Sequence, residues 1–187
     1  MARNIGHSPY KLWIMVEIRT ITEENKQDLL LKNEPFQMPG RLIPALENGK
    51  WRYSEEQFAH PESMCFPDED YDFDMLSKDG YLLGAYENGV CVGLGIFRIE
   101  CWRYVYVYDL KVSAAVRGRG IGKMLVDAGM EEARVRGYKG LYLYAQDNNL
   151  NACRFYLKTG FEIGGFDNRR YDGTSQEGKA DIIFYKK

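Results

Sequence analysis

A glycine-rich segment at residues 116–123 constrains the fold of this chain more than any other stretch. Before it, residues 104–112 alternate aromatic with aliphatic side chains, as a half-buried strand does. After it, apolar side chains return at helical spacing, at Ile121, Met124, Leu125 and Ala128. A helix N-terminus has unpaired N–H groups and a partial positive charge, and glycines let an anion approach them closely. The segment therefore predicts a strand, an anion-binding turn and a helix, in that order.

The spacing of the glycines separates this turn from two common phosphate loops. A dinucleotide-binding fingerprint that starts at Gly118 needs a glycine where Lys123 stands. A Walker A loop that ends at Lys123 needs a glycine in place of Arg117 and a serine or threonine at position 124. The pattern that fits is R-x-x-G-x-G, and it resembles the acetyl-CoA loop of the GNAT superfamily of N-acetyltransferases. An ordinary glycine-rich turn is the alternative.

A second motif lies nearer the C-terminus. Residues 141–146 alternate as a strand, residues 147–149 offer helix caps, and residues 150–159 read as a helix that stops at Gly160. The second signature of the superfamily, N-x-x-A-x-x-F-Y-x-x-x-G-F, is matched by Asn149, Ala152, Phe155, Tyr156, Gly160 and Phe161. Both motifs stand in the order that the superfamily has, so residues 90–165, roughly two-fifths of the chain, resemble a GNAT domain.

The resemblance implies a single-domain α/β fold, with a mixed, mostly antiparallel twisted sheet, flanking helices and a splay between the fourth and fifth strands. The splay falls near residues 109–112 and 144–146. The residue patterns agree with this fold and with a tight hairpin turn at Asn88-Gly89. Strands are expected at 17–20, 81–86, 90–99, 104–112, 141–146, 161–164 and 180–185, and helices at 22–32, 121–136 and 150–159.

We expect one domain over residues 15–187, in which residues 15–86 form the substrate side and residues 87–187 the acetyl-CoA side. Residues 33–80 are interrupted by prolines and show no period, which predicts an irregular, loop-rich insertion with an ordered aromatic wall. Residues 1–14 also lack a period, so we expect a flexible and dispensable extension.

Charge and cysteine content exclude several classes of function. The net charge is −2, yet residues 54–79, the acidic segment, hold nine acidic residues and one lysine. This acidic segment argues against a nucleic-acid partner and suits a cationic ligand, with a solvated loop as the alternative.

No apolar run could span a membrane and no signal peptide pattern is present, so we expect a cytoplasmic protein without a membrane partner. The four cysteines form no C-x-x-C pair and two histidines accompany them, so no metal site is expected.

The resemblance also implies the chemistry, which is transfer of an acetyl group from acetyl-CoA to an amine. Tyr156 matches the tyrosine that hydrogen-bonds the sulfur of the cofactor and acts as general acid. Most amines are protonated at neutral pH, so a base is useful. Asp109 is our candidate for this base, and Glu100 is the reserve candidate. The alternative for Asp109 is a hydrogen-bonded residue at the end of a strand, and the alternative for Tyr156 is a tyrosine that only packs in the core. The expected cofactor-binding residues are Leu110, Lys111, Val112, Arg117, Gly118, Arg119, Gly120, Ile121, Gly122, Lys123, Asn149 and Tyr156.

The N-terminal half narrows the acceptor. Residues 34–44, Glu47-Asn48, Trp51 and the acidic segment resemble the streptothricin acetyltransferases of Gram-positive bacteria, as do residues 146–156. This implies acetylation of the β-lysine amino group of streptothricin, a polycationic antibiotic, and thereby antibiotic resistance. The expected substrate-binding residues are Trp51, Asp68, Asp70, Tyr71, Asp72 and Gln146. Another amine acceptor, such as a polyamine, an aminoglycoside or a protein, stays open, as does a non-catalytic acyl-CoA sensor. The chain is expected to be a monomer or a homodimer.

Overall fold

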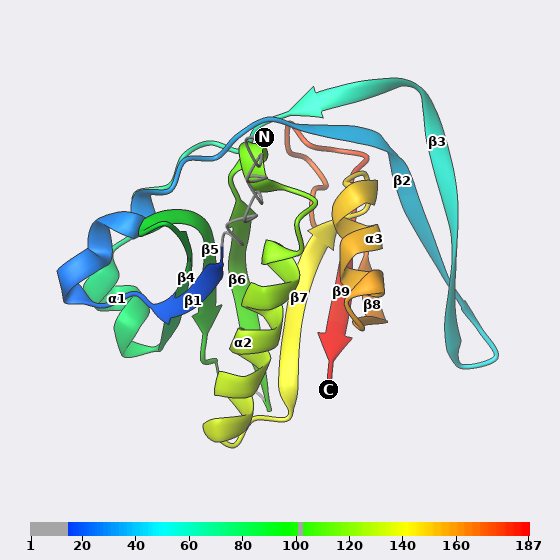
Figure 1. Ribbon diagram of the computed structural model, residues 1–187. Coiled ribbons are helices and arrows are strands. Elements are labelled where there is room, and N and C mark those ends of the chain that lie inside the picture. The colour runs from blue at the N-terminus through cyan, green and yellow to red at the C-terminus, as the bar shows by residue number, and fades with distance from the viewer. Residues whose placement is uncertain (1–14, 101–102) are drawn as a thin grey trace, which may run out of the picture.

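A seven-stranded sheet organises the computed structural model, which describes residues 15–100 and 103–187 (Figure 1). The strands stand in the order β1-β4-β5-β6-β7-β9-β8. Their bounds are Val16–Thr20 (β1), Gly80–Glu87 (β4), Val90–Arg98 (β5), Tyr104–Val112 (β6), Gly140–Gln146 (β7), Glu162–Asp167 (β8) and Asp181–Lys186 (β9). Neighbouring strands are antiparallel except β6 and β7, which run parallel. The expected mixed, mostly antiparallel sheet of one α/β domain is confirmed.

Helices cover both faces of this sheet. α2 (Ile121–Val135) and α3 (Leu150–Lys158) pack on one face, around a core that includes Phe97 and Leu143. The 3-10 helix η1 (Glu23–Leu30) and α1 (Phe73–Lys78) cover the opposite face, around Leu82 and Leu94. Because successive residues of a strand point to opposite faces, β4 supplies both cores and is apolar along most of its length.

The helices on either side of the predicted splay form where the motifs place them. A short 3-10 turn, η2 (Ala114–Val116), leads from β6 to the glycine-rich segment. Gly120, with φ of 84°, precedes the first residue of α2, and the helix gives way to Gly137 at φ 83°. Only glycine adopts such angles without strain, so these two residues set the helix ends. α3 starts after its cap Asn149 and ends before Gly160, as expected.

Residues 33–80 differ from the expectation of an irregular insertion. β2 (Phe36–Glu47) and β3 (Lys50–Met64) form a separate antiparallel hairpin that projects from the body beyond α3 (Figure 1). Its prolines, among them Pro44 and Pro61, are tolerated because each strand of a two-stranded sheet has a free edge that requires no N–H donor. Asn48 and Gly49 both have positive φ and close the turn.

The base of the hairpin is attached to the turn between β7 and α3. Leu42 N–H donates to the Asp147 carbonyl over 2.9 Å, and Gly40 forms a parallel bridge with Asn149. Farther out, the Arg154 guanidinium of α3 binds the Glu55 carboxylate through two hydrogen bonds. The hairpin is thus held to the same turn that ends the splayed strand β7.

The helix expected at residues 22–32 is a shorter 3-10 helix. Asn25 breaks its regular geometry with φ of −130°, and the Asn25 side chain accepts the Thr22 N–H over 2.8 Å. Asparagine competes in this way for backbone donors and disfavours a regular α-helix. The six-residue α1, capped by Asp72, also lies inside the region expected to be irregular.

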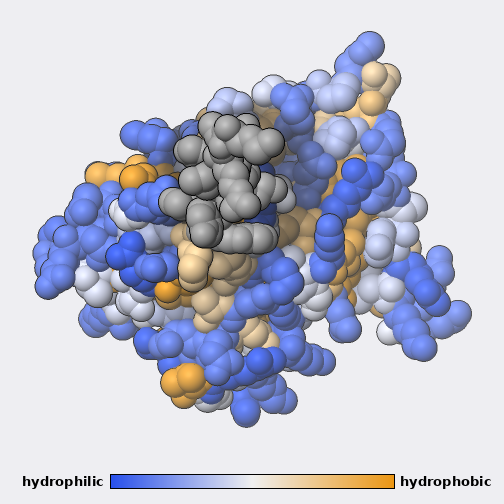
Figure 2. Space-filling view, viewed as in Figure 1, coloured by the Kyte–Doolittle hydropathy of each residue, from blue (hydrophilic) through white to orange (hydrophobic). Residues whose placement is uncertain are grey.

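The described residues contain neither a membrane-spanning helix nor a metal-binding cluster. Within residues 15–100 and 103–187, no helix is long and apolar enough to cross a membrane. The same residues contain no cluster of three or more histidine, cysteine, aspartate or glutamate side chains that could hold a metal ion. Figure 2 shows that the face bearing α2 and α3 is mainly hydrophilic. The extension expected at residues 1–14 lies outside the described part of the chain.

Candidate active site

The splay between β6 and β7 is the central feature of the site. The two strands pair at three positions, Tyr104↔Gly140, Val105↔Leu141 and Tyr106↔Tyr142. Beyond this point both strands continue, but they no longer pair with each other. Backbone groups on the two facing edges are therefore left for another partner, as the expected splay requires. The glycine-rich segment lies at this open end, because the short turn η2 leads into it from the end of β6 (Figure 1).

A β-bulge in β6 turns Asp109 toward one particular face. Phe97 of β5 pairs with Val107, whereas the preceding residue Ile96 pairs with Asp109, so Tyr108 is the extra residue. Phe97 and Val107 pack in the core under α2, whereas Ile96 belongs to the core under η1 and α1. Asp109 therefore faces the η1 and α1 side. A bulge commonly redirects a side chain next to a functional site.

The carboxylate of Asp109 has two donors on one of its oxygens. The Tyr71 hydroxyl donates to Oδ2 over 2.8 Å, and the Lys111 ammonium lies 3.1 Å from the same oxygen. Burial, and next the charge of Asp109, raise the pKa of Tyr71, so this phenol stays a donor. No residue in the described part of the chain hydrogen-bonds Oδ1. One oxygen of Asp109 is thus held by two donors, whereas the other is not.

Tyr156 approaches the splay from the opposite side, because it belongs to α3. Its ring packs against Phe155, Phe161 and Phe184 at centroid distances of 5.3–5.7 Å. Burial, followed by the negative charge of Asp109, raises the pKa of Tyr156, so its hydroxyl stays protonated and available as a donor. Tyr156 and Asp109, the two predicted catalytic residues, therefore lie on opposite faces of the sheet, Tyr156 with the core under α2 and α3 and Asp109 on the η1 and α1 side.

Two further groups were considered for catalytic roles. Glu100, the reserve base, accepts a hydrogen bond from the Tyr142 hydroxyl over 2.6 Å. Burial raises the pKa of the Cys153 thiol to about 12, so little thiolate exists at neutral pH. A cysteine nucleophile therefore finds no support in this geometry.

The glycine-rich segment presents backbone rather than side chains. Gly118 and Gly120 have φ of 77° and 84°, and a Cβ added to either would meet no atom within 4 Å. The Met124 N–H donates to the Gly120 carbonyl over 3.1 Å, which closes the first turn of α2. The N–H groups before it are those that a helix N-terminus leaves unpaired. Gly122 differs, because its Cβ would lie 3.2 Å from the Phe155 ring.

The basic side chains of the segment are engaged within the protein. Arg117 donates to the carbonyls of Val112, Pro35 and Glu34 over 2.8–3.3 Å, which ties β6 to the start of the hairpin. Arg119 binds the Glu87 carboxylate through two hydrogen bonds, and Lys123 pairs with Asp127 one turn along α2. The loop therefore presents backbone N–H groups rather than free basic side chains, and Arg117 holds the loop to the segment before β2.

The side chains of the other predicted cofactor-binding residues lie in different parts of the fold. Leu110 and Val112 pack against the core on the α2 side, whereas Lys111 points the other way, to Asp109. Asn149 accepts the Ala152 N–H over 3.2 Å and so caps α3. Ile121 is buried under α2. Backbone of the β6 edge and of the helix start, rather than these side chains, faces the splay.

The structure brings some of the predicted substrate residues together and separates others. Tyr71 contacts Asp109, and Gln146 stands at the splayed end of β7. Asp68 accepts the Asn33 N–H over 2.8 Å and pairs with Lys32, and Asp72 caps α1. Asp70 is exposed. Trp51 lies opposite Leu46, next to the turn at the far end of the hairpin.

A surface of tyrosines beside Asp109 was not predicted. We call it the tyrosine face; its members touch ring to ring at 5.1–6.0 Å along β6, β7 and β9, and they are Tyr104, Tyr106, Tyr108, Tyr142, Tyr144 and Tyr185. The regular alternation of tyrosines in residues 104–108 and 142–144 was a usable signal. Aromatic rings in this number suit a cationic ligand.

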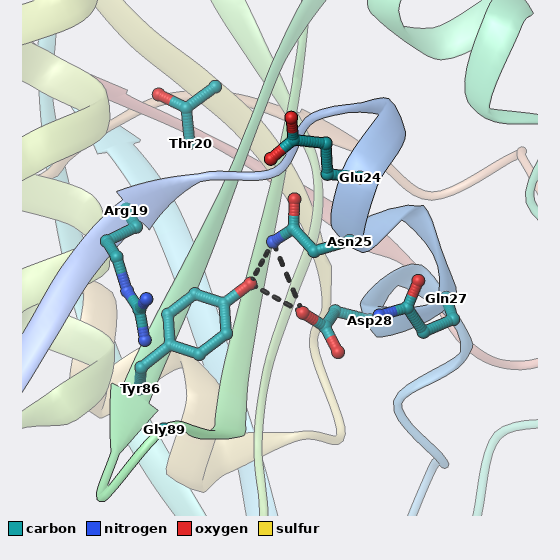
Figure 3. A pocket seen from close by; sticks show the side chains of 8 residues that line it. All are labelled: Arg19, Thr20, Glu24, Asn25, Gln27, Asp28, Tyr86 and Gly89. Atoms are coloured by element: carbon teal, nitrogen blue, oxygen red, sulfur yellow. Dashed lines mark hydrogen bonds between the residues drawn. The ribbon is translucent and has the colours of Figure 1, made fainter.

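A polar hollow at the other end of the sheet is satisfied internally (Figure 3). The Tyr86 hydroxyl donates to Asp28 over 2.6 Å and accepts from Asn25 over 2.5 Å. The Arg19 guanidinium stacks 3.9 Å over the Tyr86 ring. These groups pair with one another, so the hollow stabilises the packing of η1 on β1 and β4 and is not our candidate site.

Comparison with known proteins agrees with this geometry. Streptothricin acetyltransferase A of Bacillus subtilis (strain 168) is 35% identical over 172 residues, which cover 91% of this chain and 99% of the relative. A crystal structure assigned as a streptothricin acetyltransferase of Bacillus anthracis str. Ames, in complex with acetyl coenzyme A, has a TM-score of 0.82 at 24% identity and covers 92% of this chain and 98% of that one. Nourseothricin acetyltransferase has a TM-score of 0.75 at 24% identity, covering 91% and 97%.

At these identities the solved structures show a shared fold. The sequence profile of the Acetyltransferase (GNAT) family matches residues 44–161, which is more than half of the chain. The match includes the glycine-rich segment, the splayed strands and α3. This protein therefore belongs to the acetyltransferase (GNAT) family and is an N-acetyltransferase.

Proposed function

We propose that this protein transfers an acetyl group from acetyl-CoA to a primary amine of a cationic small molecule, and that the acceptor is the β-lysine amino group of streptothricin. The observation that carries the proposal is the two-sided splay. The glycine-rich segment and Tyr156 approach it from the α2 and α3 side, and Asp109 and the tyrosine face lie on the other. Donor and acceptor can then meet through the sheet without competing for space.

The donor side suits a pyrophosphate and an amide-containing arm. Residues 118–123 supply unpaired N–H groups at the positive end of α2, and glycines keep this surface open. The unpaired edges of β6 and β7 can bond the amides of the arm. We assign cofactor binding to the backbone of residues 110–112 and 118–123, with Arg117 and Asn149 positioning these segments.

The acceptor side suits the proton transfer that amide formation needs. A lysine-like amine has a pKa near 10.4, so only about one molecule in two thousand is neutral at pH 7. We assign proton removal to Asp109 Oδ1, since Tyr71 and Lys111 occupy Oδ2. Acetyl-CoA supplies an activated thioester when bound. Tyr156 donates a hydrogen bond to the developing charge on the sulfur.

The choice of streptothricin rests on relatedness and charge. The Bacillus subtilis relative bears that name and aligns over nearly its whole length. The tyrosine face and the exposed acids, such as Asp70, suit a polycation. Residues 15–86, with Tyr71, then supply part of the acceptor side, and residues 87–187 supply the donor side.

A thiol-release assay with acetyl-CoA and a panel of amines tests this proposal. We expect turnover with streptothricin, and mass spectrometry should place the acetyl group on its β-lysine. Asp109→Asn should lower kcat/KM about a hundredfold or more, which is a typical contribution of a general base. Turnover with a polyamine, an aminoglycoside or a peptide but not with streptothricin would show that the acceptor is another amine. Binding of acetyl-CoA without turnover of any amine would favour a non-catalytic acyl-CoA sensor.

A further inference from the structure

Arg170 lies in a cation-binding position on the acceptor side of the sheet. It belongs to residues 168–180, which connect β8 to β9 without a helix or strand. Its Nε is 2.9 Å from Oδ2 of Asp181, and its guanidinium carbon is 5.3 Å from the centroid of the Tyr144 ring. The Asp181 side chain is 4% exposed, whereas that of Arg170 is 53% exposed. A buried carboxylate beside an aromatic ring is a strong site for a cation.

Gln146 adds an unpaired acceptor to the same place. It pairs directly with Asp181 across β7 and β9, so the two side chains are neighbours on one face. The Gln146 Nε2 donates to the Tyr171 hydroxyl over 3.1 Å and to Gln176 Oε1 over 3.0 Å. Lys179 also donates to Gln176 Oε1, which fixes the orientation of both amides. The Oε1 of Gln146 is buried and has no partner among the described residues.

These groups have the chemistry that an alkylammonium requires. An ammonium has three donors, which Asp181 and Gln146 Oε1 can accept, and its charge is favoured over the Tyr144 ring. The Arg170 side chain is half-exposed, so its guanidinium can move into solvent and leave Asp181 to another cation. The buried side of the position, made by Asp181 and Gln146, would remain in place.

The position shares its surface with Asp109. The Tyr144 ring contacts the Tyr106 ring at 5.7 Å, and Tyr106 contacts Tyr108, the bulge residue before Asp109. An acceptor on the tyrosine face could therefore present one amine to Asp109 and a second cation to Asp181.

We propose that Asp181, Tyr144 and Gln146 form a subsite for a second ammonium group of the acceptor, and that Arg170 fills this subsite until an acceptor replaces it. The inference rests on the proposed function as an amine acetyltransferase and adds a selectivity for diamines over monoamines. It also assigns residues 168–180 a role in acceptor recognition.

A pair of neighbouring arginines tests the proposal. Arg170→Ala frees the subsite, and Arg169→Ala removes the same charge from an exposed side chain that pairs with Asp172. The acceptors are β-lysine amide and 3-aminohexanamide, which lacks the distal amine. We expect Arg170→Ala to lower KM for the diamine relative to the monoamine by up to about fivefold, the value of a surface ion pair. Arg169→Ala should leave this ratio as in the wild type.

A second variant keeps the test independent of folding. Tyr144→Leu removes the ring from a partly exposed position of the tyrosine face, and it should raise KM for the diamine by a factor several times larger than the factor for the monoamine, because only the diamine loses a contact to its second ammonium. An unchanged KM ratio in both Arg170→Ala and Tyr144→Leu would overturn the subsite, as would equal effects on the two acceptors.

Binding separates this inference from the proposed function. If neither amide is acetylated, calorimetric titration of β-lysine amide into the CoA-saturated protein still reports on the subsite. Tighter binding to Arg170→Ala than to Arg169→Ala would support the subsite even where streptothricin is not the substrate. Equal affinities, or no binding to any variant, would refute it.

Discussion

Replacing Gly120 by alanine should weaken acetyl-CoA binding more than it weakens the fold. Gly120 has φ of 84°, and a side chain in this region costs about 1–2 kcal/mol. A Cβ would meet no atom within 4 Å, so the loss comes from the backbone alone. For a chain of 187 residues this lowers the melting temperature by roughly 2–8 °C. If the methyl displaces the pyrophosphate from one N–H donor, Kd should rise about tenfold to a hundredfold.

Gly49→Ala is the matched control. Gly49 has φ of 74°, also has no atom within 4 Å of an added Cβ, and lies in the turn of the hairpin. Both variants should lose similar stability in thermal unfolding, but calorimetric titration with acetyl-CoA should show weaker binding only for Gly120→Ala. Gly122 is unsuitable, because its Cβ would press on Phe155. Wild-type affinity in Gly120→Ala would refute the assignment of the anion to this loop.

Three further changes test single contacts. Tyr156→Phe should lower kcat about a hundredfold, while the affinity for acetyl-CoA stays as in the wild type. An unchanged kcat would show that Tyr156 only packs in the core. Arg117→Lys keeps the charge but loses the guanidinium that donates to three carbonyls, so the free energy of unfolding in urea should fall by about 1–2 kcal/mol. Equal stability of variant and wild type would contradict a stabilising role for these hydrogen bonds. Burial raises the pKa of Asp127, but bonds from Lys123 and Lys186 outweigh it and hold the pKa below its usual value. This stability is present above the unfolded pKa and lost as pH falls through the folded one, so Asp127→Asn should destabilise at pH 7 and not at pH 2, and an equal effect at both would contradict the pairing.

The sequence was sufficient for the parts of the site that depend on local rules. Gly120 and Asn149 mark helix starts through backbone geometry and capping, which act over a few residues and leave a clear signature. The end of pairing between β6 and β7 followed from the resemblance that these motifs support. The same local rules predicted the Asn88-Gly89 turn, where both residues have positive φ.

Features that depend on contacts distant in sequence were missed. Pro44 and Pro61 made the hairpin look irregular, because the tolerance of an edge strand for proline is visible only once the pairing is known. The bulge at Tyr108 is hidden for a similar reason, since alternation alone does not reveal an extra residue opposite β5. The position of Trp51 is a further case, because only the pairing of β2 with β3 places it opposite Leu46, next to the turn of the hairpin.

The central claim is that donor and acceptor meet through the splay from opposite faces of the sheet. A crystal structure with a bisubstrate conjugate, in which CoA is joined through an acetyl linker to the β-amino group of β-lysine amide, tests it most directly. We expect the pyrophosphate on the N–H groups of residues 118–123, the linker between β6 and β7 beside Tyr156, and the β-lysine portion on the tyrosine face at Asp109. A conjugate bound with both halves on the α2 and α3 side, or away from the splay, would contradict the account.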